Sequence, residues 1–393
     1  MHLDSLKIQN FRLLEDVEVK KLGHVNLIVG KNNSGKSTVL EALTLLASGF
    51  ERKAVFDIAN NRDDIKHVIT EDRRPRDTRV AFENFFSGRE YPKEDESYLF
   101  IGNEDKKYIK IKHVYYEDIE TQSKVGDNIF IKTEQKVIRK KEAIDLILAE
   151  NLSSGLEVHI SNSKPKIVGL EEDDNLSYRR PASFEKLLPH SFIASQVNSI
   201  TDLAREWDKL VFTEHEALIV EILKIIEPNI ESLAFISDDY AHKRFELNNR
   251  AINGEDIRVP YIKILDKEGR VPLHSMGDGV IRLLQIILRI FNAQNGFLLI
   301  DEFENGLHYS IQAEVWRLIF ELSKQLNIQV FATTHSWDCI ESFAQVAKER
   351  EDLEGVLFRM GRSVRKSDNG KVIATEFDED ELYNLTKDKI EVR

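Results

Sequence analysis

The sequence has a single cysteine and no long apolar run, and both shortages exclude classes of protein. Cys339 is the only cysteine among 393 residues, so the chain can form neither an internal disulfide nor a cysteine-based zinc site. We expect Cys339 to lie in the core and the protein to work in a reducing compartment. No segment approaches the roughly eighteen apolar residues of a membrane span. Residues 1–10 alternate like a strand rather than resembling a signal peptide, so we expect a cytoplasmic protein without membrane contact.

Acidic residues outnumber basic residues. The chain has 55 Lys plus Arg against 68 Asp plus Glu, a formal net charge of −13 at pH 7. This balance excludes a basic surface for nucleic acid over the whole chain. Two local basic runs, both interleaved with acids, are either solvated surface, which we favour, or part of a DNA groove. They are Arg73, Arg74, Arg76 and Arg79, and Arg139, Lys140 and Lys141.

The most informative segment present is Gly30–Ser37, which has the pattern Gly, four residues, Gly-Lys-Ser of a phosphate-binding loop. It lies between a predicted strand, Val25–Val29, and a helix predicted from about Ser37 by its apolar spacing. Gly30 and Gly35 let the backbone approach a phosphate chain closely. The freed amides and the positive end of the helix then face the phosphates. Chance is the alternative, and the strand and helix on either side disfavour it.

The loop predicts a nucleoside triphosphate bound with Mg²⁺. Lys36 is predicted to bridge the β- and γ-phosphates and to act in catalysis, and Ser37 is predicted to bind Mg²⁺. The predicted nucleotide-binding residues of this segment are Gly30, Asn32, Asn33, Ser34, Gly35, Lys36, Ser37 and Thr38.

A pair of acids follows the predicted buried strand Phe297–Ile300. A carboxylate at the carboxyl end of a strand beside the phosphate-loop strand can reach the Mg²⁺ ion, and this is the role predicted for Asp301. Glu302 is then placed to orient and deprotonate the attacking water, as a catalytic base. The alternative is an ordinary acidic turn after a strand, and the phosphate loop favours the functional interpretation.

A second predicted buried strand, Gln329–Thr333, is followed by His335. A lone histidine is usually a satisfied core or surface group. Because His335 follows a strand that comes after the acidic pair, we predict that it senses the γ-phosphate and takes part in catalysis.

The loop Ser275–Gly279 comes immediately before a predicted helix, Val280–Phe291. Small residues at a helix start expose backbone amides to an anion. The phosphate loop already surrounds its own nucleotide, so we predict that Ser275, Gly277 and Gly279 contact a nucleotide bound by another subunit. A helix cap with flexible glycines is the alternative.

Composition divides the chain into three segments: 1–48 with the phosphate loop, 49–189, and 190–393 with the later motifs. The middle segment is charged, and its short alternating runs, such as Tyr108–Lys112 and Leu156–Ile160, predict antiparallel strands. We predict an α/β fold with a β-rich N-terminal lobe, a mostly parallel core sheet flanked by helices, and a charged α/β insertion at 49–189. Residues from 355 onward predict a strand, a turn, a strand and a short helix near 379–386.

Together these motifs resemble the ABC-type ATPases of the RecF, SMC and OLD class. The resemblance covers residues 1–48 and 190–393. It implies an ABC-type P-loop fold, ATP and Mg²⁺ as cofactors, and two subunits that close head to tail around two ATP molecules. The segments that carry it are Leu6–Arg12, Asn26–Ser37, Asp301–His308 and the ending Lys389–Arg393.

The resemblance also implies a role for each motif. A glutamine that reaches Mg²⁺ is expected, and Gln196, after a predicted strand, is the candidate; a surface glutamine at a strand end is the alternative. The other implied roles are Walker A for Lys36 and Ser37, the signature loop for Ser275 to Gly279, Walker B for Asp301 and Glu302, and the switch histidine for His335.

Two departures narrow the resemblance. SMC proteins carry long heptad coiled coils between their halves, and residues 49–189 show no sustained heptads. OLD nucleases append a metal-dependent TOPRIM domain, and only the 58 residues 336–393 follow His335. The chain is therefore most similar to stand-alone OLD-like ATPases of antiphage systems such as PARIS and Septu, where an adjacent gene supplies the effector.

Three functional hypotheses follow. The first is an ATPase that forms a homodimer or higher homo-oligomer around ATP and controls a separately encoded nuclease or toxin in phage defence. The second is a RecF-like repair or recombination ATPase that binds duplex DNA through the two basic runs, which the net charge disfavours. The third is a binding module with structural ATP, which Glu302 and His335 disfavour.

Overall fold

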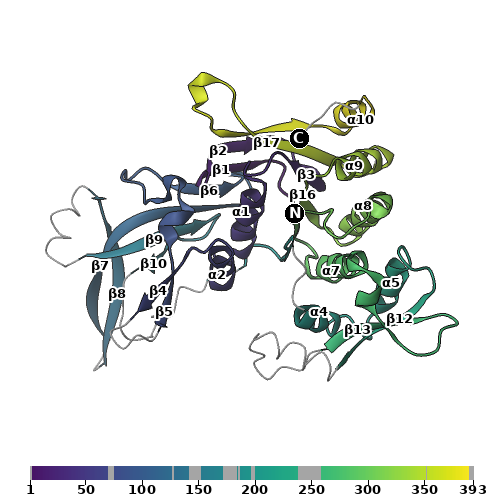
Figure 1. Ribbon diagram of the computed structural model, residues 1–393. Helices are drawn as coiled ribbons and strands as arrows, with labels where there is room; N and C mark the ends of the chain where they lie inside the picture. Colours follow the sequence, from purple (N-terminus) through teal and green to yellow (C-terminus); the bar gives the residue numbers. More distant parts are fainter. Residues whose placement is uncertain are drawn as a thin grey trace.

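The structure is a computed structural model that describes residues 2–69, 75–125, 128–140, 152–170, 184, 186–195, 200–237, 258–350 and 352–388. Gln196, the predicted glutamine ligand of Mg²⁺, lies outside these residues, as do Arg73, Arg74, Lys141 and the ending 389–393. Two large sheets form layers of the molecule, and helix α1 (Lys36–Ser48) packs between them (Figure 1).

A six-stranded sheet carries the motifs. Its strand order is β11-β15-β16-β3-β17-β18. The first five strands run parallel, and β18 is antiparallel to β17. Every residue of β15, β16 and β3 is buried, as expected for parallel strands covered on both faces. The bounds are β11 His190–Ile193, β15 Phe297–Ile300, β16 Gln329–Thr333, β3 Val25–Val29, β17 Gly355–Arg362 and β18 Val372–Phe377.

The three strands predicted beside the nucleotide motifs have the predicted bounds, but their order differs from expectation. The strand that ends at Asp301 was expected beside the phosphate-loop strand, and β16 lies between β15 and β3. Asp301 still reaches the phosphate-loop helix: its Oδ1 atom lies 3.1 Å from Ser37 Oγ and accepts a hydrogen bond from Thr333 at the end of β16.

Helices cover both faces of this sheet. Helix α1 lies on one face, while α7, α8 and α9 lie on the other, with α10 packed on α9 (Figure 1). Helix α7 spans the predicted helix 280–291 and adds residues at both ends. The bounds are α7 Asp278–Asn292, α8 Tyr309–Gln325, α9 Trp337–Glu349 and α10 Glu379–Lys387.

A smaller unit packs against α7. Its helix α5 spans Glu214–Leu223, and the Thr213 side chain caps the helix by accepting a hydrogen bond from the His215 amide. The unit contains a three-stranded sheet of order β12-β13-β14. The other bounds are α4 Ile200–Trp207, β12 Ile230–Ser237, β13 Arg258–Ile264, β14 Val271–Pro272 and the 3₁₀ turn η3 Leu273–Met276.

The second large sheet is antiparallel, with the order β10-β9-β7-β6-β1-β2 and with β8 paired to β7. The runs predicted as antiparallel strands around 108–112 and 156–160 pair with each other, as β7 and β9. Strand β6 pairs with β1, so residues from the segment 49–189 complete a sheet begun by residues 1–48. The bounds are β1 Leu6–Phe11, β2 Leu14–Val19, β6 Leu99–Gly102, β7 Tyr108–Val125, β8 Asn128–Ile138, β9 Ser153–Ile160 and β10 Lys166–Gly169.

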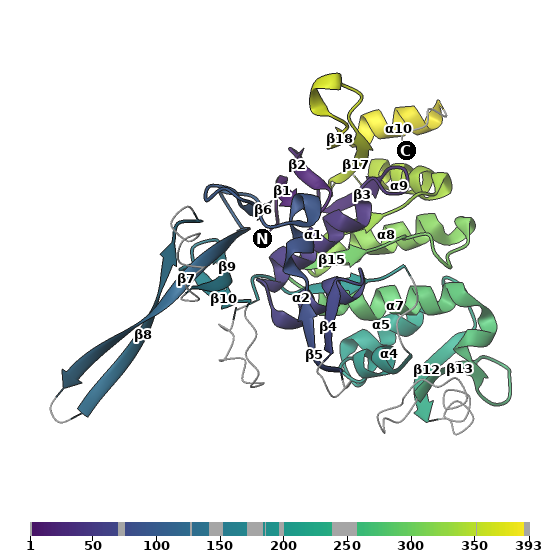
Figure 2. The same ribbon diagram turned by 60° about the vertical axis from the view of Figure 1, so that its left-hand side comes forward.

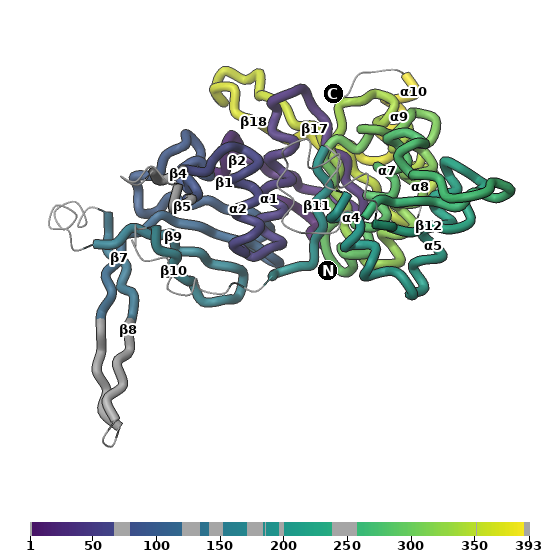
Figure 3. The backbone as a smooth tube through the Cα atoms, turned by 60° about the horizontal axis from the view of Figure 1, so that its bottom comes forward, coloured from purple at the N-terminus to yellow at the C-terminus, as the bar shows by residue number. Residues whose placement is uncertain are grey.

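The hairpin of β7 and β8 projects from this sheet away from the helices (Figures 2 and 3).

Cys339 is fully buried, as expected. In the described ranges, no helix combines the length and the apolar character needed to cross a membrane. The remaining elements are α2 Arg52–Asn60, β4 Ile65–Ile69, β5 Pro75–Val80, and the 3₁₀ turns η1 Phe82–Phe85, η2 Ser87–Arg89 and η4 Lys366–Asp368.

Candidate nucleotide site

The phosphate loop turns between β3 and α1 with backbone that only glycine adopts easily. Gly30 has φ 144° and Gly35 has φ 98°. A Cβ atom on Gly30 would lie 2.3 Å from the Met360 carbonyl oxygen and 2.7 Å from the Ser34 hydroxyl. The loop therefore has no room for a side chain at Gly30.

Two polar groups in the loop fit a phosphate chain. The Ser34 hydroxyl is buried and has no hydrogen-bond partner among the described residues. Lys36 Nζ donates to the carbonyl oxygens of Gly30 at 2.8 Å and Lys31 at 3.2 Å, so the ammonium is folded over its own loop. Burial lowers the pKa of Lys36, and the nearby carboxylates, with Asp301 first, oppose that shift. An ammonium and an unsatisfied hydroxyl on one loop are the donors that an anionic ligand requires.

The other residues predicted in the loop are placed differently from one another. Asn32 and Asn33 are exposed, and Asn33 has a left-handed backbone with φ 60°. Thr38 is buried under the first turn of α1, with 2% of its surface exposed. Its hydroxyl therefore faces protein, and any contact of Thr38 with a nucleotide would come from the backbone.

Ser37 and Asp301, which are 264 positions apart in the chain, meet at the carboxyl edge of the six-stranded sheet. Ser37 Oγ lies 3.1 Å from Asp301 Oδ1 and 3.3 Å from Asp301 Oδ2. Thr333 Oγ1 donates to the same Asp301 Oδ1 at 2.6 Å. Hydroxyl and carboxylate oxygens are the ligands that Mg²⁺ prefers, so the donor set fits this ion.

Glu302 is held in an unusual conformation at the same edge. Its backbone is left-handed, with φ 49°, and its amide donates to Thr333 Oγ1 at 2.9 Å. Its carboxylate accepts a hydrogen bond of 2.6 Å from Asn305 Nδ2, which also donates to the Ser195 carbonyl at 3.1 Å. The Glu302 side chain is 39% exposed. A positioned carboxylate that water can reach is suited to act as a base.

His335 lies beside two carboxylates. Its Nδ1 atom is 3.2 Å from Glu304 Oε1 and 4.0 Å from Glu302 Oε1. Its backbone amide also donates to Glu304 Oε1, at 3.0 Å. The structure therefore brings His335 next to the acidic pair, and the carboxylate in closest contact with the ring is Glu304.

Arg282 connects helix α7 to the carboxyl edge of the six-stranded sheet. The side chain is buried and donates to the carbonyl oxygens of Ala194, Asp301 and Glu302 at 2.7, 2.8 and 3.0 Å. Burial lowers the pKa of Arg282 to about 10. One guanidinium group thus fixes the backbone at the ends of β11 and β15, where the functional side chains begin.

The loop Ser275–Gly279 lies at the start of α7. Ser275 is exposed, and its hydroxyl donates to the Pro272 carbonyl at 2.7 Å. Gly277 is exposed, has φ 97° and precedes α7 without a side-chain cap. A Cβ atom on Gly279 would lie 2.7 Å from the Gly306 carbonyl oxygen, so Gly279 also serves close packing within the chain. The exposed position suits contact with another subunit, which stays a prediction.

Sequence reasoning missed four residues of this arrangement. Glu304 and Asn305 lie just after the acidic pair, within the segment Asp301–His308 that carries the resemblance, and that position was the available signal. Thr333 ends a strand that the sequence did predict, and Arg282 is a single charge on an otherwise apolar part of α7. Their contacts join segments far apart in the chain, which motif spacing does not reveal.

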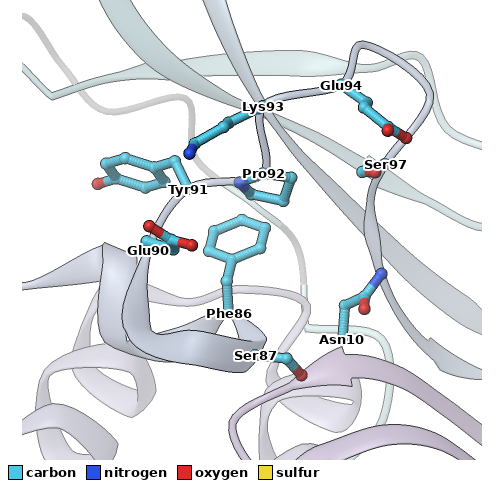
Figure 4. Close-up of a pocket in the computed structure, with 9 residues that line it drawn as sticks. All are labelled: Asn10, Phe86, Ser87, Glu90, Tyr91, Pro92, Lys93, Glu94 and Ser97. Carbon is cyan, nitrogen blue, oxygen red and sulfur yellow. The ribbon is translucent and has the colours of Figure 1, made fainter.

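A separate cavity of about 370 Å³ lies between the end of β1 and the segment 86–97 (Figure 4). Its lining includes Asn10, Phe86, Tyr91 and Lys93. None of the residues predicted for the nucleotide lines it, so this cavity is distinct from the site at the sheet edge.

The fold and the site define a P-loop ATPase, with a phosphate loop, an acidic pair and a histidine at the carboxyl edge of a parallel sheet. Residues 1–340 match the family described as "AAA ATPase domain". The chain belongs to this family.

The chain is also similar to several known proteins. The chain is 24% identical over 364 residues to a Helicobacter pylori protein named "ATP/GTP phosphatase", a match that covers 89% of each. It is 47% identical over 47 residues to the DNA replication and repair protein RecF of Lactobacillus acidophilus, but this match covers only 12% of each chain. Among solved structures, it is similar to an SMC head bound to the C-terminal winged-helix domain of ScpA, with a TM-score of 0.46, 13% identity, and coverage of 96% of this chain and 98% of that one.

Proposed function

We propose that this chain is an ABC-type ATPase of the RecF, SMC and OLD class that hydrolyses ATP to ADP and phosphate. The observation that carries the proposal is the contact between Ser37 and Asp301 at 3.1 Å. It brings the phosphate loop and the acidic pair together at one edge, with Glu302 and His335 alongside. The family match and the name of the Helicobacter pylori relative support ATP as the substrate.

In the proposed reaction, water attacks the γ-phosphorus in line with the bond to the β-phosphate oxygen, and that bond breaks. Glu302 takes the proton of the attacking water, while Asn305 keeps the carboxylate in place. Lys36 and the amides of the phosphate loop bind the phosphate chain. Ser37 and Asp301 would hold Mg²⁺, which supplies positive charge to the phosphate oxygens when bound, and Gln196 is proposed as a further ligand.

The proposed assembly is a homodimer that closes head to tail around ATP, or a higher homo-oligomer. The exposed position of Ser275 and Gly277 supports contact with a nucleotide held by a second subunit. We further propose that closure controls a separately encoded effector, a nuclease or toxin, in antiphage defence. This last step rests on the resemblance to stand-alone OLD-like ATPases alone.

Steady-state hydrolysis of ATP tests the proposed reaction. Lys36→Ala removes the ammonium from the phosphate loop, and we expect at least about a 100-fold loss of kcat/KM with weak ATP binding. Glu302→Gln keeps the shape of the side chain but removes the base. We expect kcat to fall about 100-fold or more while ATP still binds and the closed dimer accumulates on size-exclusion chromatography with light scattering.

The exposed Glu314 on α8 provides a matched control, and Glu314→Gln should hydrolyse ATP at the wild-type rate. Wild-type turnover by Glu302→Gln would show that another group is the base. A dimer that forms equally with and without ATP would reject closure around the nucleotide, and purified wild type that hydrolyses no ATP would reject the enzyme.

A RecF-like role in DNA repair is the second candidate, supported by short matches to RecF proteins that each cover 12% of this chain. Lys140, in one of the two basic runs, gives this role limited support, because its ammonium group donates to the carbonyl oxygens of Pro92 and Glu94. Duplex DNA added to the ATPase assay separates the candidates. Strong stimulation would favour the repair role, and a rate indifferent to DNA would favour control of a partner protein.

A further inference from the structure

Glu304 is a buried carboxylate that lies two positions after Glu302 and binds the residue proposed to sense the γ-phosphate. Its side chain is 10% exposed. The Oε1 atom contacts His335 twice, at 3.2 Å from ring Nδ1 and at 3.0 Å from the backbone amide. We propose that Glu304 is the positioning residue for His335, an inference that rests on the proposed ATPase function.

The contact fixes how the imidazole is presented. The Oε1 atom of Glu304 lies 3.2 Å from Nδ1, so an ionised Glu304 favours a proton on Nδ1, and Nε2 is on the opposite side of the ring. The second contact, to the backbone amide, fixes the end of β16 relative to the same oxygen. Ring orientation and backbone position are thus set by one carboxylate, as a second group orients a catalytic histidine in other enzymes.

The arrangement divides the work between two glutamates. Glu302 Oε1 is 4.0 Å from His335 Nδ1, beyond hydrogen-bond distance, and its other oxygen accepts from Asn305. Glu304 is the carboxylate within reach of the ring. Glu302 is therefore left for the attacking water, and His335 does not depend on the base for its orientation.

A carboxylate at the position of Glu304 is unfavourable for the stability of the folded state. Its second oxygen, Oε2, is buried and has no hydrogen-bond partner among the residues that the structure describes. A buried carboxylate that is incompletely paired destabilises the folded state. A purely structural role would favour an uncharged side chain here, whereas orientation of an imidazole requires the acceptor.

The test compares Glu304→Ala with Glu304→Gln in the full-length protein. Glu304→Ala removes the acceptor, and we expect kcat for ATP hydrolysis to fall about 10- to 100-fold while KM changes by less than about threefold. Glu304→Gln keeps an acceptor oxygen, and we expect its kcat to be at least about tenfold higher than that of Glu304→Ala. The thermal midpoint of Glu304→Ala should equal or exceed that of wild type, because an incompletely paired buried charge is removed.

A double-mutant cycle with His335→Ala isolates the pairing. If Glu304 acts through His335, the double variant should have the kcat of His335→Ala alone, within about twofold. Additive losses, or a lower thermal midpoint that accounts for the lost activity, would overturn the inference. Failure of the proposed ATPase function would look different, because wild type would then be inactive or Lys36→Ala would hydrolyse ATP normally.

Discussion

The two large sheets of this protein place their polar side chains in opposite ways. In the six-stranded sheet, β15, β16 and β3 are buried along their whole length, and polar residues begin where the strands end. In the seven-stranded sheet, β1 and β9 alternate between buried and partly exposed residues. A parallel sheet covered on both faces leaves its ends for chemistry, whereas an antiparallel sheet with one open face presents polar groups along its length.

The largest effect should come from two matched glycines, one at the end of a strand in each sheet. Gly30 follows β3 with φ 144°, and Gly102 ends β6 with φ 129°. An added Cβ would lie 2.3 Å from the Met360 carbonyl oxygen in the first case and 2.2 Å from the Lys107 carbonyl oxygen in the second. Both alanine variants should lose more than about 1 kcal/mol of stability.

Only Gly30→Ala should also lose ATP binding, by about 100-fold or more, because the phosphate loop must move. Gly102→Ala should bind ATP within about threefold of wild type. Isothermal titration with a non-hydrolysable ATP analogue measures both affinities, and urea unfolding measures both stabilities. Equal losses of affinity would show that the antiparallel sheet also supports nucleotide binding, which would break the comparison.

A second prediction contrasts a buried position in one sheet with an exposed position in the other. Leu298 in β15 is fully buried, whereas Val137 in β8 is 43% exposed. Leu298→Ala leaves a cavity between the sheet and its helices, and we expect a loss of about 2–5 kcal/mol in the free energy of unfolding. Val137→Ala should cost less than about 0.5 kcal/mol. Urea midpoints give both values, and similar losses would show that the projecting hairpin is packed against another surface in solution.

The same contrast explains which parts of the fold the sequence predicted. The short, mainly apolar runs of β3, β15 and β16 gave the right bounds, because their length and the polar or glycine residues after them are typical of strands buried on both faces. Their order was wrong, because β16 lies between β15 and β3. Strand order depends on crossover connections through helices, and no local pattern encodes it.

The sequence also predicted only some of the residues of the candidate site. Motif spacing pointed to Ser37 and Asp301, which lie 3.1 Å apart, although their roles stay predictions. The spacing gave no sign of Glu304, because its partner His335 lies 31 positions further along and follows a different strand. Contacts between strand ends arise only when the sheet has formed, so residues that position others are harder to predict than those that carry a motif.

The smallest predicted effect is an acid sensitivity of the antiparallel sheet at His113. His113 in β7 stacks on Tyr91, with ring centroids 4.1 Å apart, and its Nε2 atom lies 3.0 Å from Ser154 Oγ. Burial, together with the positive charge of Lys140, lowers the pKa of His113 to about 4, against 6.5 for the unperturbed group. Between these pH values the unfolded chain binds a proton that the folded chain does not, so stability falls as the pH drops from about 6.5 towards 4.

Hydrogen exchange measured by mass spectrometry at pH 7 and pH 5, corrected for intrinsic exchange, should show β7 losing more protection than β3. His113→Phe keeps an aromatic ring against Tyr91 but cannot be protonated, so the extra loss in β7 should disappear. Ser154→Ala is the matched control, since it removes the hydrogen bond to His113 and keeps the titrating ring. If His113→Phe and wild type lose equal protection in β7, the acid response comes from other groups and the antiparallel sheet has no weakness of its own.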